Sequence, residues 1–394
     1  MTPLAQLRIE VERELTGNIL PFYLQHAFDE QYGGFYGRID NDNHIHHQAP
    51  KGLVQHSRFL WAYARVHRQL KSAAYRVTAG RAFDYLLDHF WDEDAGGLYW
   101  LVDYRGRPLV KNKYIYGQSY GIYGFSEYYL ATGDESSLKM AVSLFRLLED
   151  EARDNQYGGY FEVFQRAWGR PLEKNVDEVP GPVDKTMNSH LHLLEAYTNL
   201  FHAWPGEEMH QALRALIRLH LDHIINPATW HLQLHFTAGW TPLNDHISYG
   251  HDVEASWLLV EAAEMLGEAD LLAEAQNIAL RMAQVIYDEG IDSDGGLLNE
   301  AGQLTKEWWP QAEALVGFLN AYQLSRQPYY LEAVQAIWAY IQQALVDQTN
   351  GEWFWGRQAG GALLDEEKSG LWKTPYHNGR ACLELMNRLD ALQI

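Results

Sequence analysis

The sequence predicts an all-α protein that folds as a closed toroid of six helical hairpins, with short β-hairpins between the pairs. Three observations support this prediction: a turn motif that recurs along the chain, two helical stretches between successive turns, and one unpaired helical stretch at each end. Repeats of this kind are typical of architectures in which one supersecondary unit recurs. An open solenoid of helix pairs is the alternative.

The recurring motif is a pair of glycines followed by an aromatic residue or leucine. Four copies are plain, "YGGFYGRID" at 32, "AGGLYWLVD" at 95, "YGGYFEVFQ" at 157 and "DGGLLNE" at 294, and two are degenerate, "TWHLQLHF" at 229 and "NGEWFWGR" at 350. The six copies are separated by roughly 55 to 70 residues. Each indicates a turn with glycine at positive φ that leads into a short strand.

Helical stretches fill the segments between these turns. The expected pairs are 53–70 with 75–91, 114–131 with 135–150, 186–203 with 207–225, 251–266 with 269–288, and 308–325 with 329–346. The single stretches 3–25 and 375–391 complete a sixth pair only if the ends of the chain meet, which favours the closed ring. No linker rich in proline, glycine or serine interrupts the pattern, so we expect residues 1–394 to form a single catalytic domain.

The composition excludes several classes of partner. The formal net charge is −21, from 31 basic and 52 acidic residues, and no basic cluster exists to hold a nucleic acid. No apolar run is long enough for a membrane span, and the N-terminal stretch lacks the apolar segment of a signal peptide. The only cysteine, Cys382, can form no internal disulfide. We therefore expect a cytoplasmic protein, monomeric or, as the alternative, dimeric.

Polar and aromatic residues gather where the first helix of each pair begins. These starts read "QHSRFLW" at 55, "YIYGQSYG" at 114, "KTMNSHLH" at 185, "SYGHDVEASW" at 248, "EWWPQAEA" at 307 and "TPYHNGRAC" at 374. In a toroid these starts lie at one end and face the axis, so together they predict a concave small-molecule site. His192, His251 and His377 fall in equivalent segments of three repeats, and histidine is suited to proton transfer near neutral pH.

Other chemistries find weaker support in these residues. No metal-binding helix motif occurs, and His251 with Glu254 offers two ligands at most, so we expect no metal or other cofactor. The string "GQSYG" at 117 matches a nucleophile elbow but lies in a helical pattern. A glycosidase would need two carboxylates beside the scissile bond, and Glu254 with Glu313 are the candidates. A non-catalytic sugar-binding barrel is a further alternative.

The segments "KTMNSHLHLLEAYTNL", "ISYGHDVEASWLL", "WWPQAEALVGFLNAYQ" and "WKTPYHNGRACLE" resemble the N-acylglucosamine 2-epimerase superfamily, with the nearest likeness to its cellobiose 2-epimerase branch. The likeness runs from about residue 8 to 390. It implies an (α/α)6 barrel that acts without a metal on reducing sugars. The implied reaction inverts C2 of the reducing-end glucose of a β-1,4-linked disaccharide such as cellobiose, giving 4-O-β-D-glucosyl-D-mannose.

The resemblance also implies a role for each residue of the site. His251 and His377 correspond to the acid/base pair, because inversion at C2 needs a proton to leave one face and return to the other. His192 would assist ring opening, Arg58 would stabilise the enediolate, and Glu254 would orient His251 or bind a hydroxyl. The residues expected to line the sugar site are Tyr116, Asn188, Trp308, Trp309 and Trp372.

Two questions remain open in the sequence. Mannose 2-epimerases, mannose isomerases and acylglucosamine epimerases share most of these motifs, so the sugar and the carbon that receives the proton are not fixed. Trp308 and Trp309 diverge by about 100° on a helix, so we expect one to face the pocket and the other to pack. The polar segment 170–183 is expected to form a loop at the pocket mouth.

Overall fold

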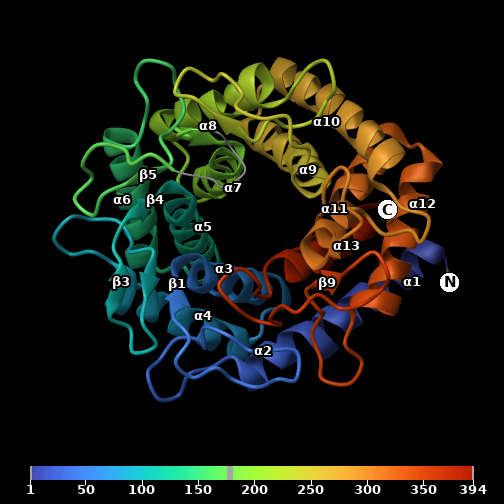
Figure 1. Ribbon diagram of the computed structural model, residues 1–394, viewed down its shortest axis with the longest axis horizontal. Helices are drawn as coiled ribbons and strands as arrows, with labels where there is room; N and C mark the ends of the chain where they lie inside the picture. The colour runs from blue at the N-terminus through green and yellow to red at the C-terminus, as the bar shows by residue number, and fades with distance from the viewer. Residues whose placement is uncertain (1, 175–180, 393–394) are drawn as a thin grey trace.

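The computed structural model describes residues 2–174 and 181–392, and these form two concentric rings of helices around a central axis (Figure 1). Six helices make the inner ring: α3 (Leu53–Leu70), α5 (Ile115–Thr132), α7 (Met187–Ala203), α9 (Tyr249–Leu266), α11 (Trp308–Ser325) and α13 (His377–Leu392). Each packs against the next, and α13 contacts α3. The predicted ring is therefore closed, and the open solenoid is excluded.

The outer ring returns the chain antiparallel to the inner one. It consists of α1 (Pro3–Glu14) and α2 (Leu20–His26), α4 (Ala73–Tyr85), α6 (Glu135–Glu151), α8 (Glu207–Leu219), α10 (Ala269–Gly290) and α12 (Pro328–Tyr340). A π-helical segment, η1 (Leu15–Ile19), joins α1 to α2, and η2 (Leu86–Phe90), η3 (His220–Ile224) and η4 (Ile341–Leu345) extend three outer helices. The first helix packs on α13, which makes the sixth pair from the two ends of the chain.

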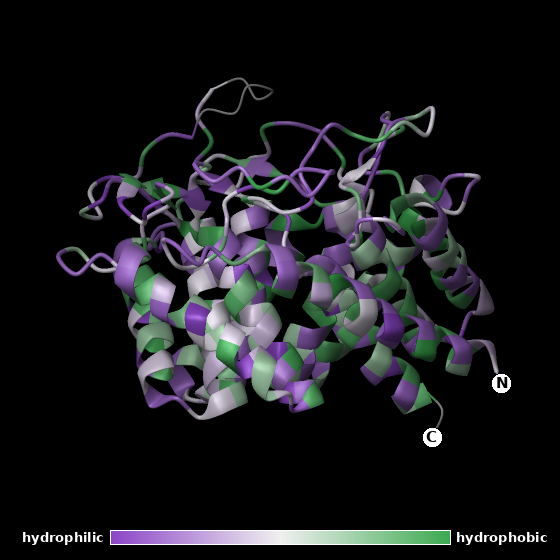
Figure 2. Cartoon of the chain, turned by 90° about the horizontal axis from the view of Figure 1, so that it is seen from below, coloured by the Kyte–Doolittle hydropathy of each residue, from purple (hydrophilic) through white to green (hydrophobic). Residues whose placement is uncertain are grey.

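The strands lie at the end of the barrel where the inner helices begin (Figure 2). They are β1 (Lys51–Gly52), β2 (Leu101–Val102), β3 (Pro108–Val110), β4 (Lys113–Tyr114), β5 (Val163–Phe164), β6 (Lys185–Thr186), β7 (His235–Phe236), β8 (Lys306–Glu307) and β9 (Gly356–Arg357). All pairings are antiparallel, in the order β1-β2-β3, β4-β5, β6-β7 and β8-β9. Four of them directly precede inner helices and so fix where those helices start.

The Gly-Gly turns have the positive φ that the sequence predicts. Gly159 has φ of 74°, and a Cβ there would lie 2.5 Å from the ring of Trp240, so only glycine fits. In the two degenerate copies the left-handed conformation falls on larger residues, Trp230 with φ of 65° and Glu352 with φ of 64°. The turn geometry is thus kept where its glycine is lost.

An ion pair, buried in four cases and partly buried in the fifth, at Lys306, ties each of five turns to the strand or loop before the next inner helix. The pairs are Lys51–Asp29 at 2.8 Å, Lys113–Asp92 at 3.0 Å, Lys185–Asp154 at 2.7 Å, Lys306–Asp292 at 2.5 Å and Lys368–Asp347 at 2.5 Å. The remaining repeat has Asn226 at the aspartate's place, and there His231 pairs with Asp252 at 2.7 Å. The sequence analysis did not predict these ion pairs.

The fourth residue of each of five inner helices accepts a hydrogen bond from the backbone that follows a turn. The bonds are Phe35 N to His56 Nε2 at 3.1 Å, Leu98 N to Gln118 Oε1 at 2.8 Å, Tyr160 N to His190 Nε2 at 2.9 Å, Leu232 N to Asp252 Oδ1 at 2.8 Å, and Leu297 N to Gln311 Oε1 at 2.7 Å. His56 and His190 are therefore structural residues. Asp252 is fully buried in this role.

Three smaller expectations can be compared with the structure. The "GQSYG" string lies inside α5, where Ser119 Oγ donates to the carbonyl of Tyr116 at 2.7 Å, so it is no nucleophile elbow. The expected loop 170–183 has an irregular course in its described parts, where Lys174 pairs with Val183, and 175–180 lie outside the described residues. No helix of the described chain combines the length and the apolar character needed to cross a membrane.

Candidate active site

The sixth residue of each of five inner helices is polar and faces the barrel axis. Counted from the first residue of α3, α5, α7, α9 and α11, these residues are Arg58, Tyr120, His192, Glu254 and Glu313. Arg380 from α13 contacts two of them and completes the ring. The helical repeat therefore places one functional group from each hairpin at the same depth in the barrel.

All ten residues predicted from the sequence line one cavity of about 230 Å³ above this ring. They are Arg58, Tyr116, Asn188, His192, His251, Glu254, Trp308, Trp309, Trp372 and His377, and Trp355 also contributes. Their side chains come from all six inner helices or from the segments just before them. The structure thus brings the whole predicted set together, and Trp355 is the lining residue that the sequence analysis missed.

Arg380 holds the carboxylates beneath the cavity. Its Nη2 donates to Glu254 Oε1 at 2.6 Å and to Glu313 Oε1 at 2.7 Å, and its Nη1 donates to Glu195. Burial by itself would raise the pKa of Glu195, but Arg380 and His192 lower it to about 2. Burial and the charge of Glu313 raise the pKa of Glu254. The sequence analysis missed Arg380, although it follows Lys373 by seven residues, as His192 follows Lys185.

His377 is oriented by one of these carboxylates. Its Nδ1 donates to Glu313 Oε1 at 2.6 Å, which leaves Nε2 as the ring nitrogen available to the cavity. Only 5% of His377 is exposed. Burial, with the charges of Arg58 and Arg380, holds its pKa well below the ordinary value. His377 is therefore a neutral base at physiological pH.

His251 is oriented differently from the expectation. Its Nδ1 lies 2.8 Å from the hydroxyl of Ser248, while Glu254 bonds to Arg380 instead. Glu254 therefore does not orient His251, because the guanidinium is the stronger partner for a buried carboxylate. Burial and the neighbouring His192 lower the pKa of His251 to about 3, so it too is neutral.

Arg58 and His192 both contact the hydroxyl of Tyr120. Arg58 Nη2 donates to Tyr120 Oη at 2.7 Å and Tyr116 Oη at 3.1 Å, and His192 Nδ1 lies 3.0 Å from Glu195 Oε2. Arg58 Nη1 also donates to the carbonyl of Trp372 at 2.5 Å. The guanidinium is fixed in place and faces the cavity as a permanent positive charge.

Tryptophans form the walls, and both members of the Trp308–Trp309 pair line the cavity. Trp309 contacts the rings of His251 and His377, with centroids 4.7 and 5.7 Å apart, and Trp308 packs on Trp355 at 4.2 Å. The expectation that only one would face the pocket is wrong, because α11 begins at Trp308 and its first turn meets the cavity edge. The Nε1 of Trp308 and the Oδ1 of Asn188 have no protein partner among the described residues, so both are available to a ligand.

Glu254, Glu313 and His377 are the described residues whose ligand atoms lie close enough together to hold a metal ion, within 4.8 Å of one another. The guanidinium of Arg380 already bonds to both carboxylates, so a divalent cation would have to compete with a buried positive charge. The donor set therefore fits the arginine better than a metal.

The chain is similar to known proteins over nearly its whole length. The N-acylglucosamine 2-epimerase (GlcNAc 2-epimerase) family pattern matches residues 34–381. The chain is 41% identical to the cellobiose 2-epimerase of Bacteroides fragilis, covering 96% of this chain and 98% of that protein, and 39% identical to that of Dictyoglomus turgidum, covering 97% and 99%. The cellobiose 2-epimerase structure from Bacillus thermoamylovorans superposes with a TM-score of 0.94 at 37% identity, covering 98% of this chain and all of that one. The chain belongs to the N-acylglucosamine 2-epimerase family.

Proposed function

We propose that this protein is a sugar 2-epimerase that inverts C2 of the reducing-end glucose of cellobiose and related β-1,4-linked disaccharides. One observation carries the proposal: His192, His251, His377 and Arg58 converge on a single tryptophan-walled cavity. The relatives named as cellobiose 2-epimerases support the same activity.

The arrangement supplies the groups that C2 inversion needs. After the sugar ring opens, one of His251 and His377 takes the C2 proton, and the electron pair moves onto the C1 carbonyl oxygen. Arg58 is placed to stabilise that negative charge. The first histidine then releases its proton to solvent, while the other histidine takes a proton from solvent and delivers it to the opposite face of C2 as the C1 carbonyl re-forms. His192, beside Tyr120, is placed to move a proton on the ring oxygen or on the C1 hydroxyl during opening.

An adjoining cavity supports a disaccharide substrate. It has a volume of about 420 Å³ and shares Tyr116, Asn188, His251 and Trp372 with the first. Trp100 and Tyr114 extend its aromatic wall, with ring centroids 4.5 Å apart. A reducing-end sugar at the histidines would leave its glycosidic partner in this second space.

The carboxylates fit a glycosidase poorly. Glu254 and Glu313 bond to the same nitrogen of Arg380, so they lie side by side instead of flanking a substrate bond.

We also propose, from the sequence, that the enzyme is a single catalytic domain and a cytoplasmic monomer, and that it needs no metal.

The test is incubation with cellobiose, mannose and N-acetylglucosamine separately in deuterated water, with and without EDTA, followed by NMR. We expect a C2 epimer from cellobiose, deuterium at C2 of the product, and the same rate with EDTA. A ketose would indicate an isomerase, free glucose a glycosidase, and binding without product a non-catalytic protein. Loss of turnover with EDTA would contradict the metal-free mechanism.

A further inference from the structure

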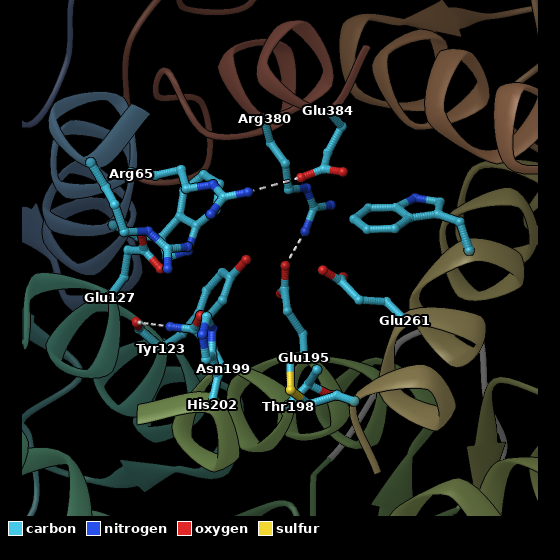
Figure 3. Close-up of a pocket in the computed structure, with 14 residues that line it drawn as sticks. Arg65, Tyr123, Glu127, Glu195, Thr198, Asn199, His202, Glu261, Arg380 and Glu384 are labelled. Carbon is cyan, nitrogen blue, oxygen red and sulfur yellow. Dashed lines mark hydrogen bonds and ion pairs between the residues drawn. The ribbon is translucent and has the colours of Figure 1, made fainter. Parts of the chain in front are cut away.

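A second polar chamber lies deeper in the barrel, beyond the active-site ring. Its volume is about 220 Å³, close to that of the active-site cavity. The thirteenth residues of four inner helices line it: Arg65 of α3, Glu127 of α5, Asn199 of α7 and Glu261 of α9. They follow the active-site ring by seven residues, or about 10 Å along a helix. Figure 3 shows them pointing toward one another around an open space.

The chamber has its own way out of the protein. Five connections between inner and outer helices ring this end, and each is only two or three residues long. The strands and long loops lie at the other end (Figure 2). Glu195, Trp257 and Arg380 form the layer between the two cavities, and we call them the floor layer. A ligand would therefore enter from the end opposite to the active site.

The lining carries hydrogen-bonding groups that the fold leaves unused. Trp61 is only 4% exposed, and its Nε1 has no hydrogen-bond partner among the described residues. Within the same part of the chain, Glu261 makes no hydrogen bond or ion pair, and Arg65 has one contact, of 3.3 Å, with Glu384. A buried polar group without a partner is costly and rare, so the Nε1 of Trp61 indicates a missing partner, and the half-buried Arg65 and Glu261 keep hydrogen-bonding capacity to spare.

The charges around the chamber are nearly balanced. Three arginines, Arg65, Arg68 and Arg380, are opposed by Glu127, Glu195 and Glu384, with which they form ion pairs. The remaining carboxyl is Glu261, whose pKa is raised by burial and by Glu384, which favours its neutral form. A charged ligand would leave uncompensated charge in a buried site, whereas a neutral one would not.

We propose that this lower chamber is a second binding site for a neutral polyhydroxylated ligand of about monosaccharide size. Hydroxyl groups donate and accept, so they suit walls that mix arginine, carboxyl and indole N–H groups. Trp61, Tyr123 and Trp257 offer flat apolar faces for a sugar ring. The floor layer links occupancy to catalysis, because Glu195 contacts His192 and Arg380 contacts Glu254 and Glu313.

The test uses methyl β-D-glucopyranoside, a sugar whose ring cannot open and which the enzyme cannot turn over. Crystals of the full chain are soaked at a concentration that fills the active site. We expect ordered sugar in both cavities of the wild type. Thr198→Met should fill the lower chamber without removing a side-chain partner, since Thr198 Oγ1 bonds only to the carbonyl of Leu194. It should lose the lower sugar and keep the upper one.

The matched control is Thr78→Met, because Thr78 is a buried threonine that bonds to the carbonyl of Ala74 in the same way but lies in α4. It should keep both sugars. Trp61→Phe removes the indole N–H together with part of the ring face and should weaken lower-chamber binding by at least about fivefold, the loss expected for one hydrogen bond. Water alone in the lower chamber while the active site is occupied would overturn the proposal, as would sugar retained there in Thr198→Met.

A kinetic readout separates this proposal from the proposed epimerase activity. In wild type, the glucoside should raise the KM for cellobiose by competition and also change kcat through the floor layer. In Thr198→Met only the change in KM should remain. A kcat effect that is identical in both proteins would overturn the coupling. The crystallographic result requires no turnover, so it stands or falls separately from the epimerase activity.

Discussion

At the scale of single residues, the site holds two histidines whose surroundings lower the pKa of their imidazoles. Burial lowers the pKa of both His251 and His377, and each uses Nδ1 for a protein contact, with Ser248 or Glu313. In each, Nε2 is therefore the ring nitrogen left available to the cavity, in a fixed orientation. The walls around them are aromatic, so little water competes for the proton.

We expect His251→Gln and His377→Gln each to lower kcat by about 10² to 10⁴, the usual contribution of an acid/base group. Both proteins should keep the wild-type circular dichroism spectrum and still bind cellobiose in calorimetry. His220→Gln is the control, because His220 is a buried histidine that lies in an outer helix away from the cavity. Wild-type turnover in either active-site variant would remove that histidine from the mechanism.

Arg380 is the residue on which the carboxylate cluster depends. Replacing it by methionine leaves Glu195, Glu254 and Glu313 buried without their shared partner, so we expect Arg380→Met to cost about 3 to 5 kcal/mol of unfolding free energy at neutral pH. The depressed pKa of Glu195, about 2, means that the pairing stabilises the fold above pH 4.5 and is lost as the pH falls toward 2.

Urea denaturation at several pH values measures this effect. In the variant the unpaired carboxyls bind protons readily, so the difference from wild type should shrink as the pH falls from 8 toward 4. A difference that stays constant over this range would show that Arg380 acts through packing alone.

At the scale of the elements, equivalent positions along the inner helices serve the same role. In α3, α5, α7, α9 and α11 the fourth residue accepts a hydrogen bond from the backbone after a turn and the sixth faces the active site, and in the first four of these helices the thirteenth faces the lower chamber. Different side chains accept the hydrogen bond at the fourth position, namely His56, His190, Gln118, Gln311 and Asp252.

This equivalence gives a prediction about acid stability. Burial lowers the pKa of His56 and His190 to about 3, so below pH 6.5 the unfolded chain binds protons that the folded chain cannot, and stability falls as the pH falls. Each histidine should cost about 2 kcal/mol between pH 7 and pH 5. His56→Gln introduces the side chain found at the same position in α5 and α11, and it should remove the part of the stability loss in acid that is due to His56.

Unfolding free energies of wild type and His56→Gln at pH 7 and pH 5 measure the difference. His44→Gln is the control, since the side chain of His44 is 78% exposed. If His56→Gln lost as much stability in acid as wild type, another group would have to account for the loss.

At the scale of the whole molecule, the active site exists only because the ring closes. His377 and Arg380 lie on α13, which is held by α1 on one side and by α3 on the other. Side-chain bonds cross the same seam, with Trp353 Nε1 donating to Glu14 Oε1 at 2.8 Å and Glu352 N donating to Asn18 Oδ1 at 2.8 Å. The first helix contributes nothing to the cavity lining but positions two residues that do.

Leu15→Ala tests this seam. Leu15 is fully buried near α13, and the change should cost about 2 to 5 kcal/mol and speed hydrogen exchange in α1 and α13 before other helices. Leu213→Ala in α8 is the matched control, equally buried and outside the seam. Equal exchange in all helices of the Leu15 variant would show that the ring opens only as one unit.

Much of the molecule could be predicted from the sequence because its signals are local. The helical period, the turn glycines and the six-fold repeat determined the barrel, and the inner helices begin within two residues of their expected starts. The polar starts of the inner helices follow from the same repeat, whereas the ten site residues were assigned from the resemblance to the N-acylglucosamine 2-epimerase superfamily. The barrel and the helix starts depend on spacing along the chain, which the sequence states directly.

Contacts between repeats were decided only by the tertiary structure. The sequence could not show that Glu254 would bond to Arg380 instead of His251, or that Trp308 and Trp309 would both reach the cavity. Nor could it show that the five Lys–Asp ion pairs would form. It also gave no sign that a second polar chamber would lie beneath the first. Each of these features brings together side chains from different hairpins. Which side chains meet depends on how each helix is rotated and how deep it lies in the barrel, and the packing of the closed ring sets both.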